Sequence, residues 1–272
     1  LRPMPVVMVS TRTTEKSSEA VRALALGAVE CVDLGSLRDG TSRIDLADTV
    51  LMAAQSSNRR RPVPELPGEN DTEPDDFRWN GKTVLIGSST GGVEALTTVL
   101  SAYPADGPPT VIAQHMPPSF LESFADRLDR TIAPKTLLAE ESQSVEKGHV
   151  YIAPGGTDHL TLSKAQPPRL RLVPDTGEAY VPSIDLLMAS GEALGRKAVG
   201  VMLTGMGRDG ADSLLKMRNA GAHTILQSGD TCVVDGMPAA ARNIGAAVEV
   251  VPLDKIGRCI LKSTSLERKE AL

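Results

Sequence analysis

The chain has 272 residues, of which 41% are hydrophobic, and its formal net charge is −5 at pH 7. This is enough for one large domain, or for one domain with a smaller piece, around a sizeable buried core. The acidic balance argues against nucleic acid as a partner, and the lack of any apolar run near ~18 residues argues against membrane insertion.

Residues 1–57 follow the pattern strand, helix, strand, helix. Apolar runs at 5–10 and 29–35 predict the strands, and helical spacing at 18–28, ended by Gly27, and at 44–55 predicts the helices. These elements make half of a doubly wound sheet, with one edge and one face uncovered. Residues 58–80 are rich in proline and charge, which is typical of a linker.

From residue 81 onward, apolar runs and helical patterns alternate. The runs that predict strands are 83–87, 110–114, 149–153, 198–203, 223–227 and 248–251. The helical patterns are 92–103, 120–132, 183–194, 211–221 and 238–245, and residues 159–163 and 169–173 predict a small hairpin insertion. The alternation predicts an α/β fold: a doubly wound, mostly parallel sheet with helices on both faces.

The segment TVLIGSSTGGVEAL, residues 83–96, joins a strand to a helix through small residues. Its glycines do not fit a dinucleotide fingerprint or a P-loop, although a generic anion site at the helix start remains open. Gly87 to Gly91 match Gly-x-Ser-x-Gly, which favours Ser89 as a nucleophile and the Thr90 backbone N–H as an oxyanion donor. A turn that only caps a helix would have a similar composition.

A serine nucleophile needs a base on the same rim of the sheet. Of the four histidines, His115 ends a predicted strand and is followed by prolines, so it shares the rim of Ser89. His149 and His223 precede strands and are expected as surface residues on the opposite rim. His159 opens the predicted hairpin and is ambiguous.

The acid that would orient this base is not fixed by the pattern. Asp209, Asp230 and Asp235 each follow an apolar run, and an aspartate before a glycine near a helix start is also a common cap. With Asp209, the chain order is serine, histidine, acid, whereas α/β-hydrolases have serine, acid, histidine. An ordinary lipase or esterase fold is therefore not expected.

The three cysteines, Cys31, Cys232 and Cys259, are odd in number and lack the spacing of metal ligands. The start of the chain lacks the hydrophobic region of a signal peptide. We expect a soluble, cytoplasmic protein without a metal site.

Five blocks together resemble the catalytic domain of the chemotaxis protein-glutamate methylesterase family. They are IGSSTGGVEAL (86–96), QHMPPSFLESFADRL (114–128), GHVYIAPGG (148–156), VGVMLTGMGRDGA (199–211) and CVVDGMPAAA (232–241). They occur in the family's order, and the resemblance covers about residues 82–262. RPMPVVMVS (2–10) and RALALGAVECV (22–32) resemble the second half of a receiver domain.

The resemblance implies a serine hydrolase that demethylates glutamate methyl esters on methyl-accepting chemoreceptors, releases methanol and deamidates glutamines. It implies Ser89, His115 and Asp209 as catalytic residues, the N–H groups of Thr90 and Met206 as oxyanion donors, and no metal or cofactor. It divides the chain into a partial receiver (1–57), a linker (58–80) and a methylesterase domain (81–265). Through a complete receiver, a chemotaxis histidine kinase would be a further partner.

Several residues depart from the family pattern. Asp235 stands where the family usually has an aromatic residue, Val181 where it has arginine, and Leu34 with Gly35 where a receiver has Lys-Pro. The phosphoacceptor aspartate belongs to the half of a receiver that this sequence lacks, and we expect residues 1–57 to pack poorly if produced alone. Two alternatives follow: a catalytically idle regulatory or scaffold protein, and a hydrolase of a different ester with the same triad.

Overall fold

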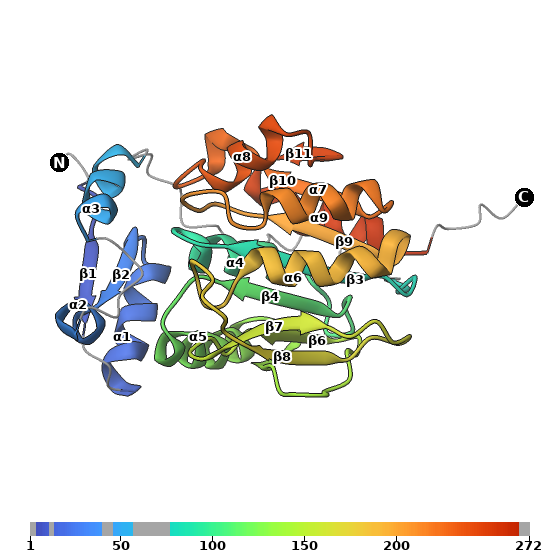
Figure 1. Ribbon diagram of the computed structural model, residues 1–272, viewed down its shortest axis with the longest axis horizontal. Helices are drawn as coiled ribbons and strands as arrows, with labels where there is room; N and C mark the ends of the chain where they lie inside the picture. The colour runs from blue at the N-terminus through green and yellow to red at the C-terminus, as the bar shows by residue number, and fades with distance from the viewer. Residues whose placement is uncertain (1–3, 11–13, 40–45, 57–76, 267–272) are drawn as a thin grey trace, which may run out of the picture.

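A seven-stranded sheet organises most of the described chain, which comprises residues 4–10, 14–39, 46–56 and 77–266 of a computed structural model (Figure 1). The strand order is β11-β10-β9-β3-β4-β6-β5, and every neighbouring pair is parallel. The strands are β3 (Thr83–Ser88), β4 (Thr110–Gln114), β5 (Lys135–Leu138), β6 (His149–Ile152), β9 (Ala198–Met202), β10 (His223–Gln227) and β11 (Glu249–Val251). The predicted doubly wound, parallel α/β fold is confirmed.

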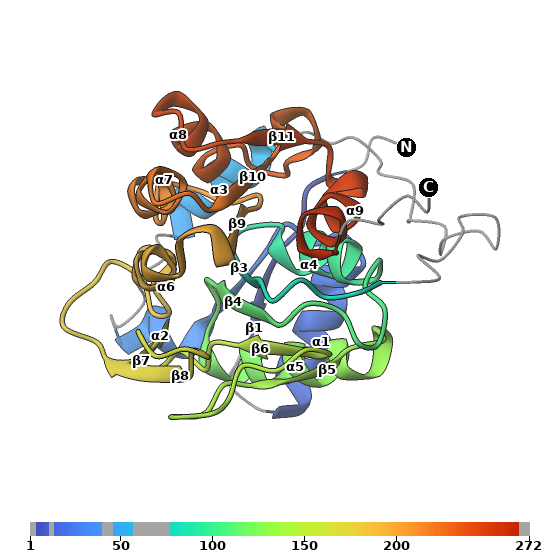
Figure 2. The ribbon, with the colours of Figure 1, turned by 90° about the vertical axis from the view of Figure 1, so that its right-hand side faces the viewer.

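Helices cover both faces of this sheet, as Figure 2 shows for α4 and α9 on one side and α6 and α7 on the other. The first face carries α4 (Gly92–Leu100), α5 (Pro118–Thr131) and α9 (Leu253–Thr264). The second carries α6 (Ile184–Gly191), α7 (Ala211–Asn219) and α8 (Met237–Asn243). Two 3₁₀ segments, η1 (Glu192–Lys197) and η2 (Gly229–Thr231), complete the connections.

The central strand explains why its sequence is a continuous apolar run. All residues of β3 are buried, with Val84 and Ile86 in the core under α4 and Leu85 in the core under α6. Successive side chains of a strand point to opposite faces, so a strand covered on both sides must be apolar throughout.

The predicted insertion is an antiparallel hairpin, β7 (Asp158–Leu162) and β8 (Leu170–Pro174). Leu160, Leu162 and Leu170 join the core beneath α6. The hairpin therefore packs on the face of the sheet where α6 begins.

The N-terminal segment forms a separate parallel pair of strands that packs on the larger body. Its elements are β1 (Val7–Ser10), α1 (Thr14–Ala25), β2 (Glu30–Asp33), α2 (Leu34–Asp39) and α3 (Leu46–Gln55). Ala20, Val21 and Leu24 of α1 are buried in the same core as residues of α4 and α5, and α1 lies beside α5 in Figure 1. Val9 of β1 and Leu51 of α3 remain exposed.

Three elements were not predicted, namely α2, β5 and α9. β5 is short and begins at the exposed Lys135, so it lacks a continuous apolar run. The predicted linker lies mainly outside the described residues. Its last part is packed: Trp79 Nε1 donates to the Lys82 carbonyl (2.7 Å), and Asn80 Nδ2 donates to the Ser263 carbonyl (3.1 Å). Among the described helices, none has the length and hydropathy needed to cross a membrane.

Candidate active site

The carboxyl ends of β3, β4 and β9 meet at the point where the strand order reverses. β3 lies between β4, which follows it in the chain, and β9, which comes much later. Ligand sites of open α/β sheets form at such a reversal. Backbone hydrogen bonds join the three strand ends: Ser89 N donates to the Thr204 carbonyl, and His115 N donates to the Ser88 carbonyl, both at 3.0 Å.

The turn that carries Ser89 is fixed by close approaches that only glycine permits. A Cβ on Gly205 would lie 2.7 Å from Ser89 Cβ, and one on Gly92 would overlap the side chain of Gln114. Gln114 is buried, and its Nε2 donates to the carbonyls of Ser89 and His115, both at 3.0 Å. Gln114 was not among the predicted site residues; its only signal in the sequence is that a polar residue ends an apolar strand.

His115 and Asp209 are in direct contact. Nε2 of His115 lies 2.8 Å from Oδ2 of Asp209. The first turn of α6 also holds this carboxylate, since Ile184 N donates to Oδ2 (2.8 Å) and Asp185 N donates to Oδ1 (3.0 Å). A helix N-terminus favours a carboxylate because its free N–H groups carry partial positive charge.

The electrostatics keep Asp209 ionised. Burial acts to raise the pKa of Asp209, but the hydrogen bond and charge of His115 and the two backbone N–H groups outweigh it, so the pKa lies below its usual value. Asp209 is thus the acid that contacts His115, whereas Asp235 pairs with Arg242 at 2.8 Å and Asp230 lies in η2.

Nδ1, the other ring nitrogen of His115, is the candidate acceptor for the proton of Ser89. Nδ1 is buried and has no hydrogen-bond partner within the described residues. A carboxylate on Nε2 favours a proton on that nitrogen, and the lone pair then lies on Nδ1. In the described part of the chain, Ser89 Oγ makes no hydrogen bond either, and such contacts often tighten only when substrate binds.

Tyr180 covers the imidazole. The rings of His115 and Tyr180 are stacked, with centroids 4.2 Å apart and planes 13° from parallel. The stack restricts the ring to the plane in which it meets Asp209. Tyr180 was not predicted as a site residue, because nothing in its local pattern links it to the histidine that follows β4.

His159, left ambiguous by the sequence, supports the helix start that holds Asp209. It is fully buried; its Nδ1 accepts a hydrogen bond from Ser183 N (2.9 Å), and its Nε2 faces Glu178 (3.2 Å) and Asp175 (3.4 Å). Ser183 is the N-cap of α6, whose first turn holds Asp209. His159 therefore fixes the segment that carries both Tyr180 and the helix start.

We expect His159→Ala to lower kcat by about 10- to 100-fold with little change in KM. The substitution leaves the buried Ser183 N–H without an acceptor, which costs about 1–3 kcal/mol, and displaces the α6 start that orients Asp209. Steady-state hydrolysis kinetics on folded protein measure the effect. His149→Ala, on the opposite rim at the start of β6, is the matched control and should behave as wild type. Wild-type kcat in His159→Ala would contradict the assignment.

The two candidate oxyanion donors lie in neighbouring loops. Thr90 is buried, Met206 is 37% exposed, and within the described residues neither backbone N–H donates to another protein group. Thr204 Oγ1 donates to the Thr90 carbonyl (3.0 Å) and accepts from Val234 N (3.0 Å). The two loops are thus fixed relative to each other, with N–H groups available for a ligand.

The N-terminal segment touches this site. Thr90 Oγ1 donates to Glu30 Oε2 of β2 at 2.7 Å, one residue from Ser89. Burial raises the pKa of Glu30, although the hydrogen bonds from Thr90 and from Cys31 N act to lower it. A carboxyl in these surroundings resists ionisation as the pH rises.

We expect the burial of Glu30 to make stability fall with rising pH. The folded pKa of Glu30 lies above its ordinary value of 4.5, so its stabilising contribution is complete below pH 4.5 and is lost as the pH rises through the folded pKa. The slope is at most about 1.4 kcal/mol per pH unit. Denaturant unfolding at several pH values should show this decline in wild type and in Glu19→Gln, which alters an exposed residue of α1, but not in Glu30→Gln. Identical pH profiles for Glu30→Gln and wild type would contradict the prediction.

His149 and His223 begin β6 and β10, on the opposite rim, as expected.

Comparison with known proteins identifies close similarities. The family described as CheB methylesterase matches residues 84–260. A protein-glutamate methylesterase/protein-glutamine glutaminase of Agrobacterium fabrum is 47% identical, over 100% of this chain and 79% of that protein. One of Caulobacter vibrioides is also 47% identical, over 98% of this chain and 79% of that protein.

A solved structure also matches. The crystal structure of the Thermotoga maritima CheB methylesterase catalytic domain superposes with a TM-score of 0.64 and 37% identity. It covers 67% of this chain and 98% of that domain.

Proposed function

The chain belongs to the CheB methylesterase family, and from this membership we propose that it hydrolyses glutamate methyl esters on chemotaxis receptors with Ser89, His115 and Asp209 as its catalytic residues. It is a carboxylic ester hydrolase by family. The observation that carries the assignment of residues is the 2.8 Å contact between His115 and Asp209 on the rim where Ser89 follows the end of β3.

The first half of the reaction acylates the serine. His115 Nδ1 takes the proton of Ser89 Oγ as the oxygen attacks the ester carbonyl, and Asp209 stabilises the resulting imidazolium through Nε2. The N–H groups of Thr90 and Met206 stabilise the oxyanion. The C–O bond to the methoxy group then breaks, and the proton on His115 passes to the leaving group, which departs as methanol.

The second half restores the enzyme. A water molecule gives a proton to His115 Nδ1 and attacks the glutamyl ester of Ser89. The bond to Ser89 Oγ breaks, the serine recovers its proton from His115, and the glutamate carboxyl is released. The same steps on a glutamine side chain release ammonia in place of methanol, and we propose this deamidation as the second activity.

Methanol release from a methylated chemoreceptor tests the proposal directly. Covalent labelling of Ser89 by a serine-directed phosphonate separates the substrate from the chemistry: labelling without methanol release would point to a different ester. Absence of both would leave an idle fold, an alternative that the ordered contact of Asp209 with His115 and α6 argues against.

We further propose that residues 1–57 are a partial receiver, 58–80 a linker and 81–265 the methylesterase domain, and that a chemotaxis histidine kinase is the partner of a complete receiver. The separate β1–β2 pair and the start of the family match at residue 84 support this division.

The departures at Asp235 and Val181 lie outside the proposed triad. Asp235 is paired with Arg242 at 2.8 Å, and Val181 precedes the Pro182–Ser183 start of α6. We propose that both bear on receptor docking or substrate preference rather than on proton transfer.

A further inference from the structure

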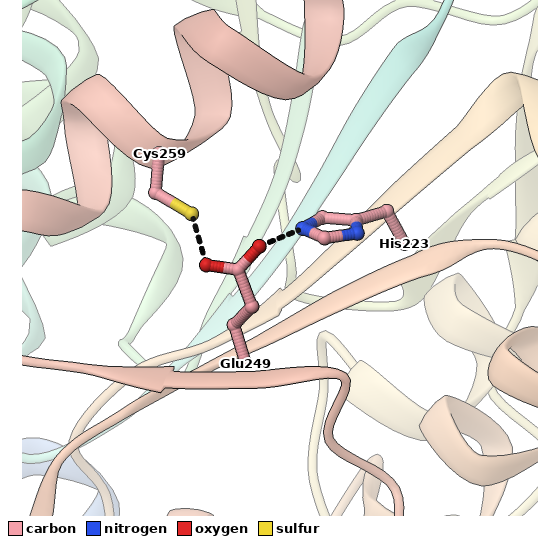
Figure 3. Close-up of side chains that lie close together, drawn as sticks. All are labelled: His223, Glu249 and Cys259. Atoms are coloured by element: carbon pink, nitrogen blue, oxygen red, sulfur yellow. Dashed lines mark hydrogen bonds and ion pairs between the residues drawn. The ribbon is translucent and has the colours of Figure 1, made fainter.

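Three side chains of different chemistry converge far from the proposed triad. His223 begins β10, Glu249 begins β11 and Cys259 lies in α9, and Figure 3 shows the three side chains pointing toward one another. His223 Nε2 lies 3.0 Å from Glu249 Oε1, and Cys259 Sγ lies 3.1 Å from Glu249 Oε2. All three donor atoms lie within 4.8 Å of one another. Because the strands are parallel, this cluster occupies the rim opposite Ser89.

The imidazole is not satisfied by its protein neighbours. His223 Nε2 is buried and, despite its short distance to Glu249, forms no hydrogen bond of acceptable geometry within the described residues. The ring can carry its proton on Nδ1, so Nε2 can offer its lone pair to a metal. The His223 nitrogen, the Glu249 carboxylate and the Cys259 thiol are therefore arranged as the ligands of a metal ion would be.

The donor set fits one class of ion. Imidazole nitrogen, thiolate sulfur and carboxylate oxygen are the three ligand types of protein-bound Zn²⁺, at about 2.0–2.3 Å from the metal. Tetrahedral ligands at those distances lie about 3.4–3.6 Å from one another, and the observed separations, from 3.0 Å to at most 4.8 Å, bracket this range. Hard cations such as Mg²⁺ and Ca²⁺ prefer oxygen alone and do not suit this set.

The charges also permit a divalent cation. The Cys259 thiol donates to Glu249 Oε2 at 3.1 Å, and a metal that binds the sulfur displaces this proton. In that step the S–H bond breaks, an S–metal bond forms and one proton is released to solvent. The thiolate and Glu249 then supply two negative charges for the cation. Lys82 and Lys262 are the positively charged side chains near the cluster.

We propose that His223, Glu249 and Cys259 form a binding site for Zn²⁺ or a divalent ion of the same ligand preference. Water completes the coordination, since Glu249 is exposed and leaves one side of the cluster open. The ion would tie the edge strand β11 to β10 and to α9, and its role is therefore structural. The site was not expected from sequence, because its ligands come from three separate elements without motif spacing.

Cobalt titration of the full chain tests the site. Co²⁺ bound to a thiolate gives a charge-transfer band in the near ultraviolet, and Zn²⁺ should remove the band by competition. Wild type and Cys232→Ser, which alters a cysteine outside the cluster, should both give the band, and Cys259→Ser should lose it. His223→Ala should weaken Co²⁺ binding at least about tenfold. No band in wild type, or a band of equal strength in Cys259→Ser, would overturn the proposal.

Thermal unfolding gives a second readout that does not depend on spectroscopy or activity. Zn²⁺ that binds the folded state should raise the Tm of wild type and of Cys232→Ser and leave that of Cys259→Ser unchanged. An equal rise in Cys259→Ser would locate the metal elsewhere, for example at His159, Asp175 and Glu178, which include no thiol, and would also overturn the proposal. Methanol release by each variant checks that the fold is retained.

Discussion

Replacement of Ser89 by alanine is expected to lower kcat for methanol release by at least about 10⁴-fold. The substitution removes the oxygen that attacks the ester, and the remaining His115–Asp209 pair has no nucleophile to deprotonate. The volume lost is one oxygen atom at a turn held by Gly205, Gln114 and Thr204, so the fold should be retained. The measurement is methanol release from a methylated receptor under single-turnover and steady-state conditions.

Ser101→Ala is the matched control for this substitution. Ser101 follows α4 on the exposed surface, and its hydroxyl donates only to the Thr98 carbonyl. It should release methanol at the wild-type rate. If Ser89→Ala kept more than about a hundredth of the wild-type rate, the nucleophile would have to be another group.

Asp209→Asn is expected to lower kcat by about 10⁴-fold while leaving substrate binding close to wild type. Oδ2 of Asp209 faces both His115 Nε2 and Ile184 N, and Oδ1 faces Asp185 N. An asparagine has one oxygen, so either orientation sets its NH₂ group against a backbone donor. When the NH₂ group faces His115, it favours the tautomer with the proton on Nδ1, and the ring can no longer accept the serine proton.

The same substitution should reduce stability at neutral pH. The folded pKa of Asp209 lies below its ordinary value, so its contribution is present above the unfolded pKa and is lost as the pH falls through the folded pKa. Asp212→Asn is the matched control, because Asp212 is exposed and pairs with Arg208 on the surface of α7. Wild-type kcat in Asp209→Asn would show that the imidazole is oriented by other groups, such as the Tyr180 ring.

Chain order alone predicted which residues share the rim of the sheet. One apolar run ends in the glycine-rich turn of Ser89, and a second ends in His115, so both residues lie at the carboxyl ends of predicted strands. The helical patterns between the strands imply that these strands are parallel. Local sequence carries this information because buried strands and helices have characteristic spacings of apolar residues.

The residue pattern did not distinguish Asp209 from Asp230 and Asp235 as the acid that contacts His115. The choice depends on β9 lying next to β3, which is a property of strand order and not of any local pattern. Tyr180 and Glu30 were missed, and His159 was left ambiguous, for a related reason, since each acts through a contact with a segment far away in the chain. Side chains that position others leave no motif, because their partners are set by tertiary packing.

The missed elements follow similar physics. β5 is a strand because it pairs with β6 at the edge of the sheet. α9 is amphipathic, but it follows directly on β11 without a polar N-cap residue. Neither has the strong local signals that mark β3 or α4.

The position of β3 between β4 and β9 also determines when the site can form during folding. During synthesis β3 leaves the ribosome early and can pair with β4, yet its other edge waits until β9 has been made. Pairings between distant segments are slow to form because a long loop must first close. The serine turn is completed by Gly205 and Thr204, and so the site assembles late, as a product of the whole chain's folding and not of its first half.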